Sequence, residues 1–379
     1  MTGPRRILIV NAGSSSLKLS VLGPDDEVIK SAELPAPGGS VPEDAAALRG
    51  QLANLGPVDS VGHRIVHGGT QYRAPVLLSP QVRRQLAALT DLAPLHQPKS
   101  LAALDAVHEL LPDIPAVASF DTAFHTTIPD AASTFALPQQ WRDRWTLRRF
   151  GFHGLSHCYA SRRAARLLRP PGPDGFAARM PTRIITCHLG AGASLAAVRD
   201  GRCVDTTMGF TPLDGLVMAT RSGSVDPGLV LWLEENAGLP AAEVAATLET
   251  QSGLLGLTGT ADMREVLSRA AAGDKRAALG RDVYLHRLRG AIAAMAASLD
   301  GLDALVFTGG VGEHSPEVRS RAAGGLGFLG VRLDEALNAA TPQADDYEIG
   351  AVGAPARTFV IAAREDKQIA AEVRSVLAP

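Results

Sequence analysis

The sequence predicts an α/β fold that occurs twice within one chain. An apolar run at 7–10 breaks into a small, hydroxyl-rich turn before a second alternating run begins, and the run at 184–187 repeats this plan. His188 lies 177 positions after Asn11, and that shift is close to half of the 379 residues. In each half, strand patterns precede helical patterns. We therefore expect two related α/β domains with a cleft between them.

The first half begins with three strand patterns that short turns separate, as in an antiparallel meander. Their residues are 6–10, 17–22 and 27–33. Apolar residues at helical spacing then predict helices, and a short apolar run predicts a buried parallel strand. The helices are expected at 81–92, 99–111 and 156–168, and the strand at 115–119.

The second half repeats this order. A meander is expected at 183–188, 194–199 and 202–206, followed by helices at 226–237, 241–250, 262–272 and 281–299 and a buried strand at 303–308. A Pro/Gly-rich segment at 169–182 is expected to be an exposed loop inside this half rather than a domain boundary.

Composition indicates a soluble globular chain with room for two cores. The sequence is 46% hydrophobic and 20% charged with a net charge of -2, so nucleic acid is not an evident partner. No apolar stretch approaches the roughly 20 residues of a membrane span, and the start leads into only a short apolar run. The three cysteines follow no disulfide or metal spacing. We expect a cytoplasmic protein.

Three glycine-rich turns are candidates for phosphate and nucleotide contact. In the first, Gly13 allows close approach, the hydroxyls of Ser14–Ser16 can donate to phosphate oxygens, and Lys18 supplies a positive charge. The second turn is His188–Gly192. The third, at 307–316, follows an apolar strand and precedes a helix that opens with Pro316, where an ordinary strand-to-helix turn is the alternative.

One further glycine pattern is a decoy. Gly325, Gly327 and Gly330 match the dinucleotide fingerprint, but they follow a helix pattern and lead into a strand pattern. This order is the reverse of the strand-to-helix order that a dinucleotide-binding turn requires, so we assign the pattern to structure.

Charged side chains in loops indicate an anion site. Arg64 precedes a glycine pair and Arg221 lies in a loop before a helix, so one arginine from each half can clamp an anion, although surface ion pairing is the alternative for either alone. Asp121 follows a buried strand, where open α/β sheets bind ligands. His153 and His157 invite a zinc hypothesis, but no third ligand accompanies them and Gly154 favours a loop, so we prefer phosphate contact by His153.

Six ordered motifs together resemble the acetokinase (acetate kinase) family across nearly the whole chain. They are Asn11-Ala-Gly-Ser-Ser-Ser-Leu-Lys18, Gly-His-Arg64-Ile-Val-His-Gly-Gly, Phe-Asp121-Thr-Ala-Phe-His, Gly-Phe-His153-Gly-Leu-Ser-His, His188-Leu-Gly-Ala-Gly and Thr-Arg221-Ser-Gly. The resemblance implies duplicated ribonuclease-H-like domains, as in the actin, hexokinase and Hsp70 superfamily. It also implies a first domain of residues 1–125 plus 367–379 and a second of residues 126–366.

The resemblance implies reversible, Mg²⁺-dependent transfer of the ATP γ-phosphoryl group to acetate, giving acetyl phosphate and ADP, by a homodimer. Arg64 would hold acetate, Arg221 and His153 would stabilise the transferring phosphoryl group, and Asp121 would be the catalytic carboxylate. Asn11 and Glu365 resemble the magnesium-linked pair. The acetate methyl would lie against Val66, Leu95, Phe152 and Pro212. The nucleotide would contact Ser14, Ser16, Lys18, His188, Leu189, Gly190, Ala191, Gly192, Asp262, Met263, Arg264, Gly310, Val311, Gly312, Glu313 and His314.

Some residues differ from the family pattern. Ala191 and Ala193 stand where Asn and Ser are usual, Ser224 where Asp is usual, and His314 and Arg364 where Asn is usual. Most of these positions lie in or beside nucleotide-handling loops, so an altered phosphoryl donor such as pyrophosphate is one alternative. A propionate or butyrate kinase of the same family is a second, and a nucleotide-gated, non-catalytic protein of the actin superfamily is a third.

Overall fold

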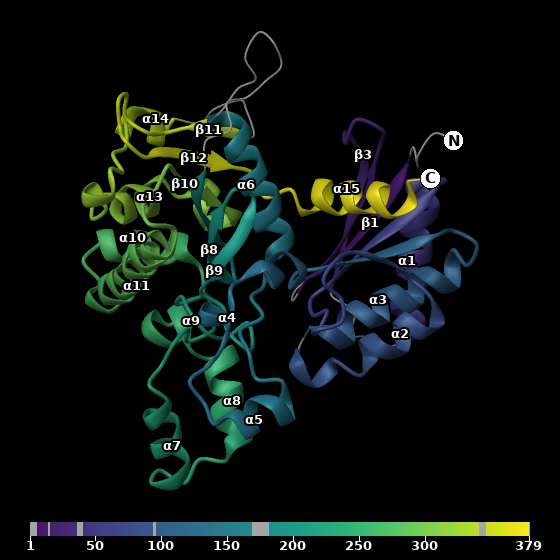
Figure 1. The fold of residues 1–379 in the computed structure, drawn as a ribbon, viewed down its shortest axis with the longest axis horizontal. Helices are drawn as coiled ribbons and strands as arrows, with labels where there is room; N and C mark the ends of the chain where they lie inside the picture. Colours follow the sequence, from purple (N-terminus) through teal and green to yellow (C-terminus); the bar gives the residue numbers. More distant parts are fainter. Residues whose placement is uncertain are drawn as a thin grey trace. The chain divides into compact units, whose positions relative to one another are not determined.

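The computed structural model describes residues 6–13, 16–35, 41–93, 96–168, 182–340 and 346–378, with 41–46 described by their backbone alone. The chain divides into two compact units (Figure 1). Unit 1 comprises Met1–Thr126, Phe152–Tyr159 and Arg364–Pro379, and unit 2 comprises Thr127–Gly151 and Ala160–Ala363.

Unit 1 is built on a six-stranded mixed sheet in the order β3-β2-β1-β4-β6-β5. The first three strands form the expected antiparallel meander, whereas β1, β4 and β6 run parallel to one another. The carboxyl ends of these three parallel strands therefore lie at one edge of the sheet. The strands are β1 (Ile7–Ala12), β2 (Ser16–Leu22), β3 (Val28–Pro35), β4 (Ser60–Ile65), β5 (Val76–Leu77) and β6 (Ala116–Phe120).

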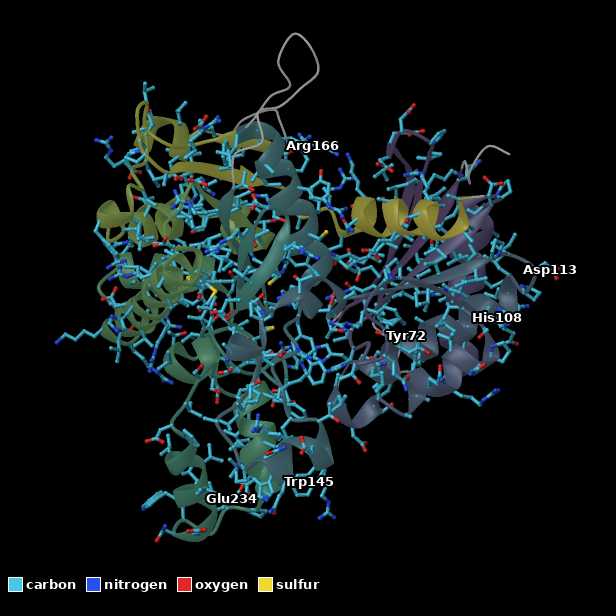
Figure 2. All side chains as sticks on the ribbon, viewed as in Figure 1. Tyr72, His108, Asp113, Trp145, Arg166 and Glu234 are labelled. Carbon is cyan, nitrogen blue, oxygen red and sulfur yellow. The ribbon has the colours of Figure 1, made fainter. Side chains whose placement is uncertain are left out.

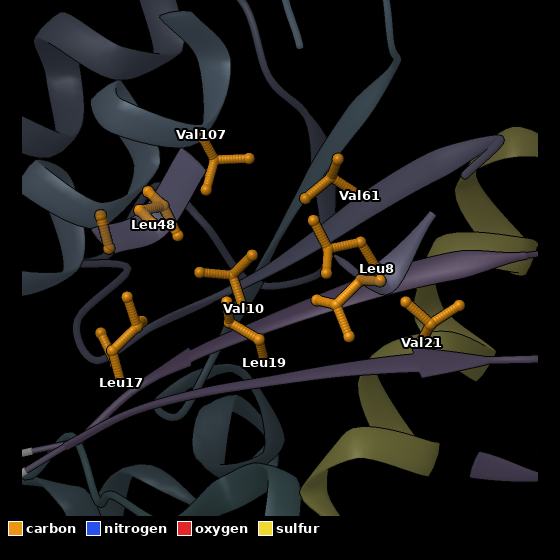
Figure 3. Close-up of a cluster of buried hydrophobic side chains, with 11 residues drawn as sticks. Leu8, Val10, Leu17, Leu19, Val21, Leu48, Val61 and Val107 are labelled. Atoms are coloured by element: carbon orange, nitrogen blue, oxygen red, sulfur yellow. The ribbon is translucent and has the colours of Figure 1, made fainter. Parts of the chain in front are cut away.

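Helices cover both faces of this sheet. Side chains alternate along β1, so that Leu8 and Val10 join a core with α1 and α3 (Figure 3), while Ile7 and Ile9 pack against α15 on the opposite face. Burial on both faces explains why β1 is a continuous apolar run. The helices and short turns of 3₁₀ helix are α1 (Val41–Leu55), α2 (Pro80–Ala87), η1 (Thr90–Leu92), α3 (Gln97–Leu110), η2 (Ala123–Thr127) and α15 (Glu365–Leu377).

Unit 2 repeats the same sheet plan. Its order is β11-β12-β10-β7-β8-β9, in which β7, β8 and β9 form an antiparallel meander and β7, β10 and β12 run parallel. This topology confirms the duplication that the 177-residue repeat predicts. The strands are β7 (Arg183–Leu189), β8 (Ala193–Arg199), β9 (Arg202–Thr206), β10 (Ala304–Thr308), β11 (Asp346–Glu348) and β12 (Arg357–Ile361).

The long helix α11 packs on β8 and β9 and carries the main helical contribution to the unit 2 core, including Tyr284, Leu288 and Ile292. α6 (Gly154–Leu168) begins in unit 1 and continues in unit 2. The remaining helices are α4 (Asp130–Ser133), α5 (Gln139–Trp145), α7 (Pro227–Glu235), α8 (Ala241–Thr250), α9 (Gly253–Thr258), α10 (Met263–Ala271), α11 (Lys275–Leu299), α12 (Gly309–His314), α13 (Pro316–Ala323), η3 (Gly327–Leu329) and α14 (Glu335–Ala339).

Two local predictions are wrong. The third glycine-rich turn contains the short helix α12, in which the Gly309 N–H donates to the Glu313 carboxylate 2.8 Å away, while the predicted helix that opens with Pro316 is present as α13. Gly154 begins α6 rather than lying in a loop, whereas His157 lies within the predicted helix at 156–168. The decoy pattern at 325–330 follows α13 and contains η3, as its assignment to structure predicts. The segment 169–181 lies outside the described residues.

Within the described ranges, none of the helices combines the length and the apolar character needed to cross a membrane.

Candidate active site

The parallel strands of unit 1 bring Arg64 and Asp121 together. Arg64 pairs in register with Ser119 on the neighbouring strand β6, and Asp121 follows that strand directly. The Arg64 guanidinium donates through Nε at 3.1 and 3.2 Å and through Nη2 at 2.7 Å to the Asp121 carboxylate. This two-sided pairing fixes the plane of the guanidinium.

Asn11 and Glu365 complete this cluster from the two ends of the chain. Arg64 Nη1 donates to Asn11 Oδ1 at 3.0 Å, Asn11 Nδ2 donates to Glu365 Oε2 at 2.7 Å, and Arg64 Nη1 lies 3.5 Å from Glu365 Oε2. Glu365 is the first residue of α15, which packs closely on β4 at Gly62. A Cβ atom there would lie 2.5 Å from the side chain of Ile369, so the absence of a side chain lets the helix approach.

The cluster holds one cationic group and two carboxylates in a largely buried place. The side chain of Asp121 is 1% exposed and that of Arg64 is 13% exposed. Burial raises the pKa of Asp121 to about 6, with Glu365 adding to this effect and Arg64 opposing it, so the carboxyl is ionised at pH 7. Burial alone would lower the pKa of Arg64, but attraction to both carboxylates outweighs burial and raises it.

His153 is joined to Asp121 through the backbone of Gly154. The Gly154 N–H donates to the Asp121 carbonyl at 3.0 Å, and a Cβ atom on Gly154 would lie 2.1 Å from that oxygen. Only glycine fits this contact. His153 itself adopts φ 56°, a left-handed conformation that is strained for a residue with a side chain and that recurs at functional sites. His157 is buried on α6, with its ring 5.7 Å from that of His125.

The chemistry of this donor set fits Mg²⁺. The described residues contain no group of three or more His, Cys, Asp or Glu side chains that could hold a metal ion. Mg²⁺, however, commonly uses one or two protein carboxylates and completes its shell with water and substrate phosphate oxygens. Asn11, Asp121 and Glu365 offer only hard oxygen ligands, and the excess negative charge of the cluster favours a cation.

The first glycine-rich turn joins β1 to β2. Gly13 N–H donates to the Ser16 carbonyl at 2.8 Å, and Lys18, which pairs in register with Asn11, is exposed. Ser14 lies outside the described residues.

Of the residues expected to contact the acetate methyl, Val66 and Phe152 are buried in unit 1, Pro212 belongs to unit 2, and Leu95 lies outside the described residues.

In unit 2, a network of backbone contacts positions Arg221. Its Nη1 donates to the Pro212 carbonyl at 3.1 Å, and its backbone carbonyl accepts from Met218 N–H at 3.1 Å. Gly253 approaches this loop so closely that a Cβ atom would lie 2.6 Å from the Arg221 carbonyl. Burial lowers the pKa of Arg221, against the attraction of Glu249, but an arginine keeps its charge at pH 7.

The nucleotide candidates of unit 2 lie in three segments. The His188–Gly192 turn ends β7, and the Ala191 carbonyl accepts from Ala219 N–H in the Arg221 loop at 3.1 Å. α12 follows β10 beside the end of β7, since a Cβ atom on Gly309 would lie 3.0 Å from the Leu189 backbone. At the start of α10, the Asp262 carboxylate accepts from both the backbone and the guanidinium of Arg264.

Sequence reasoning did not find the buried polar residues around these candidates. Gln97 and Thr122 are buried and hydrogen-bond to the loop after β4, and His125 donates through Nε2 to the Phe152 carbonyl at 2.9 Å. Thr122 and His125 stand beside Asp121 in one motif, which is the signal that could have found them.

The fold places the chain in a class. Two α/β units with the same order of meander and parallel strands define the two-domain, actin-like ATPase architecture, in which the carboxyl ends of the parallel strands carry the ligand-binding residues.

The comparisons define the family. The Acetokinase family model matches residues 46–371. An acetate kinase of Synechococcus sp. is 43% identical over 98% of this chain and 99% of its own length. Crystal structures of Porphyromonas gingivalis acetate kinase (33% identity, 98% of this chain, 100% of that chain) and of a Francisella tularensis propionate kinase (34%, 97% and 98%) each align with a TM-score of 0.86. The chain belongs to the acetokinase family.

Proposed function

We propose that this protein is an acetate kinase, which transfers the γ-phosphoryl group of ATP reversibly to acetate. The proposal rests on the hydrogen bonds that the Arg64 guanidinium makes. Within the described chain, hydrogen bonds engage three of its five N–H groups, on Nε, Nη1 and Nη2. Each terminal nitrogen has a second N–H beyond these three bonds, with the Glu365 carboxylate 3.5 Å from Nη1, and two such N–H groups can bind a carboxylate in a bidentate manner. This supports Arg64 as the residue that holds acetate.

The reaction needs positive charge rather than a base. A carboxylic acid of this kind is ionised at pH 7, so its oxygen can attack phosphorus without losing a proton. The difficulty is the approach of an anionic nucleophile to an anionic phosphate. Arg64 neutralises the acceptor, and Asp121, which is paired with it, orients the guanidinium rather than moving a proton.

We assign stabilisation of the transferring phosphoryl group to Arg221 and His153. An arginine in this role typically contributes a factor of about 10³ to 10⁵ in rate. The contacts with Pro212 and Gly253 support the assignment because they tie the side chain and the backbone of Arg221 to neighbouring segments of unit 2. The strained backbone of His153 and its link to Asp121 through Gly154 support the second role.

Asn11 and Glu365, with Asp121 beside them, are the residues that would hold Mg²⁺. When bound, the ion would offset the negative charge of the nucleotide phosphates. The nucleotide itself would contact Ser14, Ser16 and Lys18 of unit 1 and the His188–Gly192, Asp262–Arg264 and Gly310–His314 segments of unit 2. We also propose that the enzyme is a cytoplasmic homodimer.

The test is an assay for acyl phosphate, trapped as the hydroxamate, with MgATP or Mg-pyrophosphate and with acetate, propionate or butyrate. We expect acetyl phosphate from acetate and MgATP, and a loss of at least about 10³-fold in kcat in Arg221→Ala. Arg321→Ala is the matched control, because Arg321 pairs with Glu317 and is 45% exposed. If the wild type forms no acyl phosphate from any of these acids, the proposal is wrong.

Propionate kinase is the second candidate function. The Francisella tularensis structure titled a propionate kinase matches this chain as well as the acetate kinase structure does. A difference of one methylene changes binding in an apolar pocket by only about 1–3 kcal/mol. The ratio of kcat/KM for the two acids in the same assay separates the candidates.

A further inference from the structure

We propose that Gln97 is a positioning residue that sets the selectivity for the acyl group by fixing the loop that carries Val66. The inference rests on the proposed function, since Val66 and Phe152 are selectivity residues only if a short carboxylic acid is the acceptor. Gln97 is the first residue of α3 and is 0% exposed. Its polar side chain is therefore buried, beside α2 and the loop that follows β4.

The side-chain amide of Gln97 pairs with both backbone groups of one loop residue. Its Oε1 accepts from His67 N–H at 3.2 Å, and its Nε2 donates to the His67 carbonyl at 3.2 Å. The same Nε2 donates to the Leu86 carbonyl of α2 at 3.2 Å. Gln97 therefore pairs with His67 as a neighbouring strand would and ties the loop to both helices. Buried backbone groups need such partners.

Two further contacts fix the loop after Val66. Gly68 N–H donates to the Thr122 hydroxyl at 3.0 Å, and Gly69 N–H donates to Nδ1 of His67 at 2.9 Å. A Cβ atom on Gly68 would lie 2.7 Å from the Tyr72 carbonyl. The loop is therefore packed without spare room, and Thr122 connects it to the residue beside Asp121.

The His67 ring connects the fixed loop to Phe152. The two rings are in edge-to-face contact with centroids 5.5 Å apart, and the Phe152 carbonyl accepts from His125. His67 Nδ1 accepts a hydrogen bond, so that nitrogen carries no proton, and burial lowers the pKa of His67 to about 4. The neutral ring thus makes an apolar contact. Gln97 fixes His67, and His67 adjoins Val66 in sequence and Phe152 in space.

Rigidity of this kind decides whether a small pocket can reject a larger acid. An apolar pocket discriminates one methylene by about 10–200-fold, and only if its walls do not yield. Without the hydrogen bonds of Gln97, fewer contacts hold the segment carrying Val66 in place. We expect such a change to lower the preference for acetate over propionate.

The experiment compares Gln97→Met with Gln85→Met in the full-length protein. Methionine keeps the approximate length of glutamine but offers no amide. Gln85 is the matched control because it stands on α2 of the same unit and its amide oxygen accepts from the Tyr72 hydroxyl instead of bonding to the His67 backbone. We expect the ratio of kcat/KM for propionate to kcat/KM for acetate to rise about tenfold in Gln97→Met and to stay at the wild-type value in Gln85→Met.

A second variant helps to separate a change in selectivity from a loss of folded protein. Gln97→Glu keeps the acceptor for His67 N–H but turns its second oxygen toward the His67 and Leu86 carbonyls, so a rise in the same ratio is expected here too. A general loss of folded protein lowers both rates and leaves their ratio unchanged. If both Gln97 variants are folded by circular dichroism and keep the wild-type ratio, Gln97 is structural only and the inference is wrong. A wild type without acyl phosphate would instead remove the proposed function, and the inference with it.

Discussion

At the scale of single residues, the cluster around Arg64 sets one positive charge against two negative charges. One guanidinium faces the carboxylates of Asp121 and Glu365, at 2.7 and 3.5 Å, in a region that water reaches poorly. Such a cluster persists only if each charge has partners, since an isolated buried charge costs several kcal/mol. Asn11 supplies the neutral partner between Arg64 and Glu365. The arrangement leaves a net negative charge that a bound cation can offset.

This balance predicts an acid limb in the pH profile of kcat/KM for acetate. The raised pKa of Asp121, about 6, means that the carboxyl gains a proton as pH falls through this value. Protonation weakens its hold on Arg64, so activity is present above about pH 6 and falls about tenfold per pH unit below it. The measurement covers pH 5.5 to 8, where acetate stays ionised.

Asp121→Asn tests the assignment of that limb. The amide cannot titrate, so the variant should be weakly active with a flat profile across the same range. Asp105→Asn, which removes the carboxylate that pairs with the surface residue Arg83, serves as the control and should keep the limb. An unchanged limb in Asp121→Asn would assign it to another group.

At the scale of elements, α7 and α5 of unit 2 leave several large apolar side chains exposed to solvent. Leu229, Leu231 and Trp232 of α7 are 49–55% exposed, and Trp141 and Trp145 of α5 are 51% and 50% exposed. Both helices lie in the same region of unit 2 (Figure 1), where Figure 2 labels Trp145 and Glu234. Apolar patches of this kind mark interaction surfaces, and a second copy of the chain is the commonest partner.

We therefore expect Trp232→Asp to convert a dimer into a monomer. A charge on the exposed face of α7 would have to lose its water in the interface, while the monomer tolerates it. Light scattering after size-exclusion chromatography measures the mass. Phe328→Asp is the control, because Phe328 is 74% exposed on η3 and its replacement should leave the dimer intact. A monomeric wild type, or a dimeric Trp232→Asp, would contradict the proposal.

At the scale of the whole molecule, the duplication could be predicted because short sequence patterns indicate the strands of each copy. Each meander shows as strand patterns separated by short turns, and parallel strands such as β1 and β10 are continuous apolar runs. The predicted strand at 115–119 is shifted by one residue from β6, and the predicted strand at 303–308 begins one residue before β10. Helix α8 has the predicted bounds.

The remaining features depend on contacts between residues distant in sequence. Neither α1 nor α15 was predicted, and the core side of α15 holds only short stretches such as Ile369–Ala370, whose partners are on β1 and β6. α11 begins at Lys275 because Asp274 caps it, earlier than its apolar spacing predicts. Asn11 and Glu365 meet because α15 packs on β1 and β4 and so brings residues near the C-terminus to the end of β1. Family resemblance named both residues, while the role of Gln97 needed the structure.

The central claim is that Arg64 binds the carboxylate of the acceptor. The most direct test is the steady-state KM for acetate and for MgATP in Arg64→Lys. Lysine keeps the positive charge but lacks the fork that pairs with two carboxylates at once. We predict that the KM for acetate rises at least about 100-fold, equivalent to about 2.7 kcal/mol, while the KM for MgATP changes less than about threefold. An unchanged KM for acetate, with the loss confined to MgATP, would contradict the account.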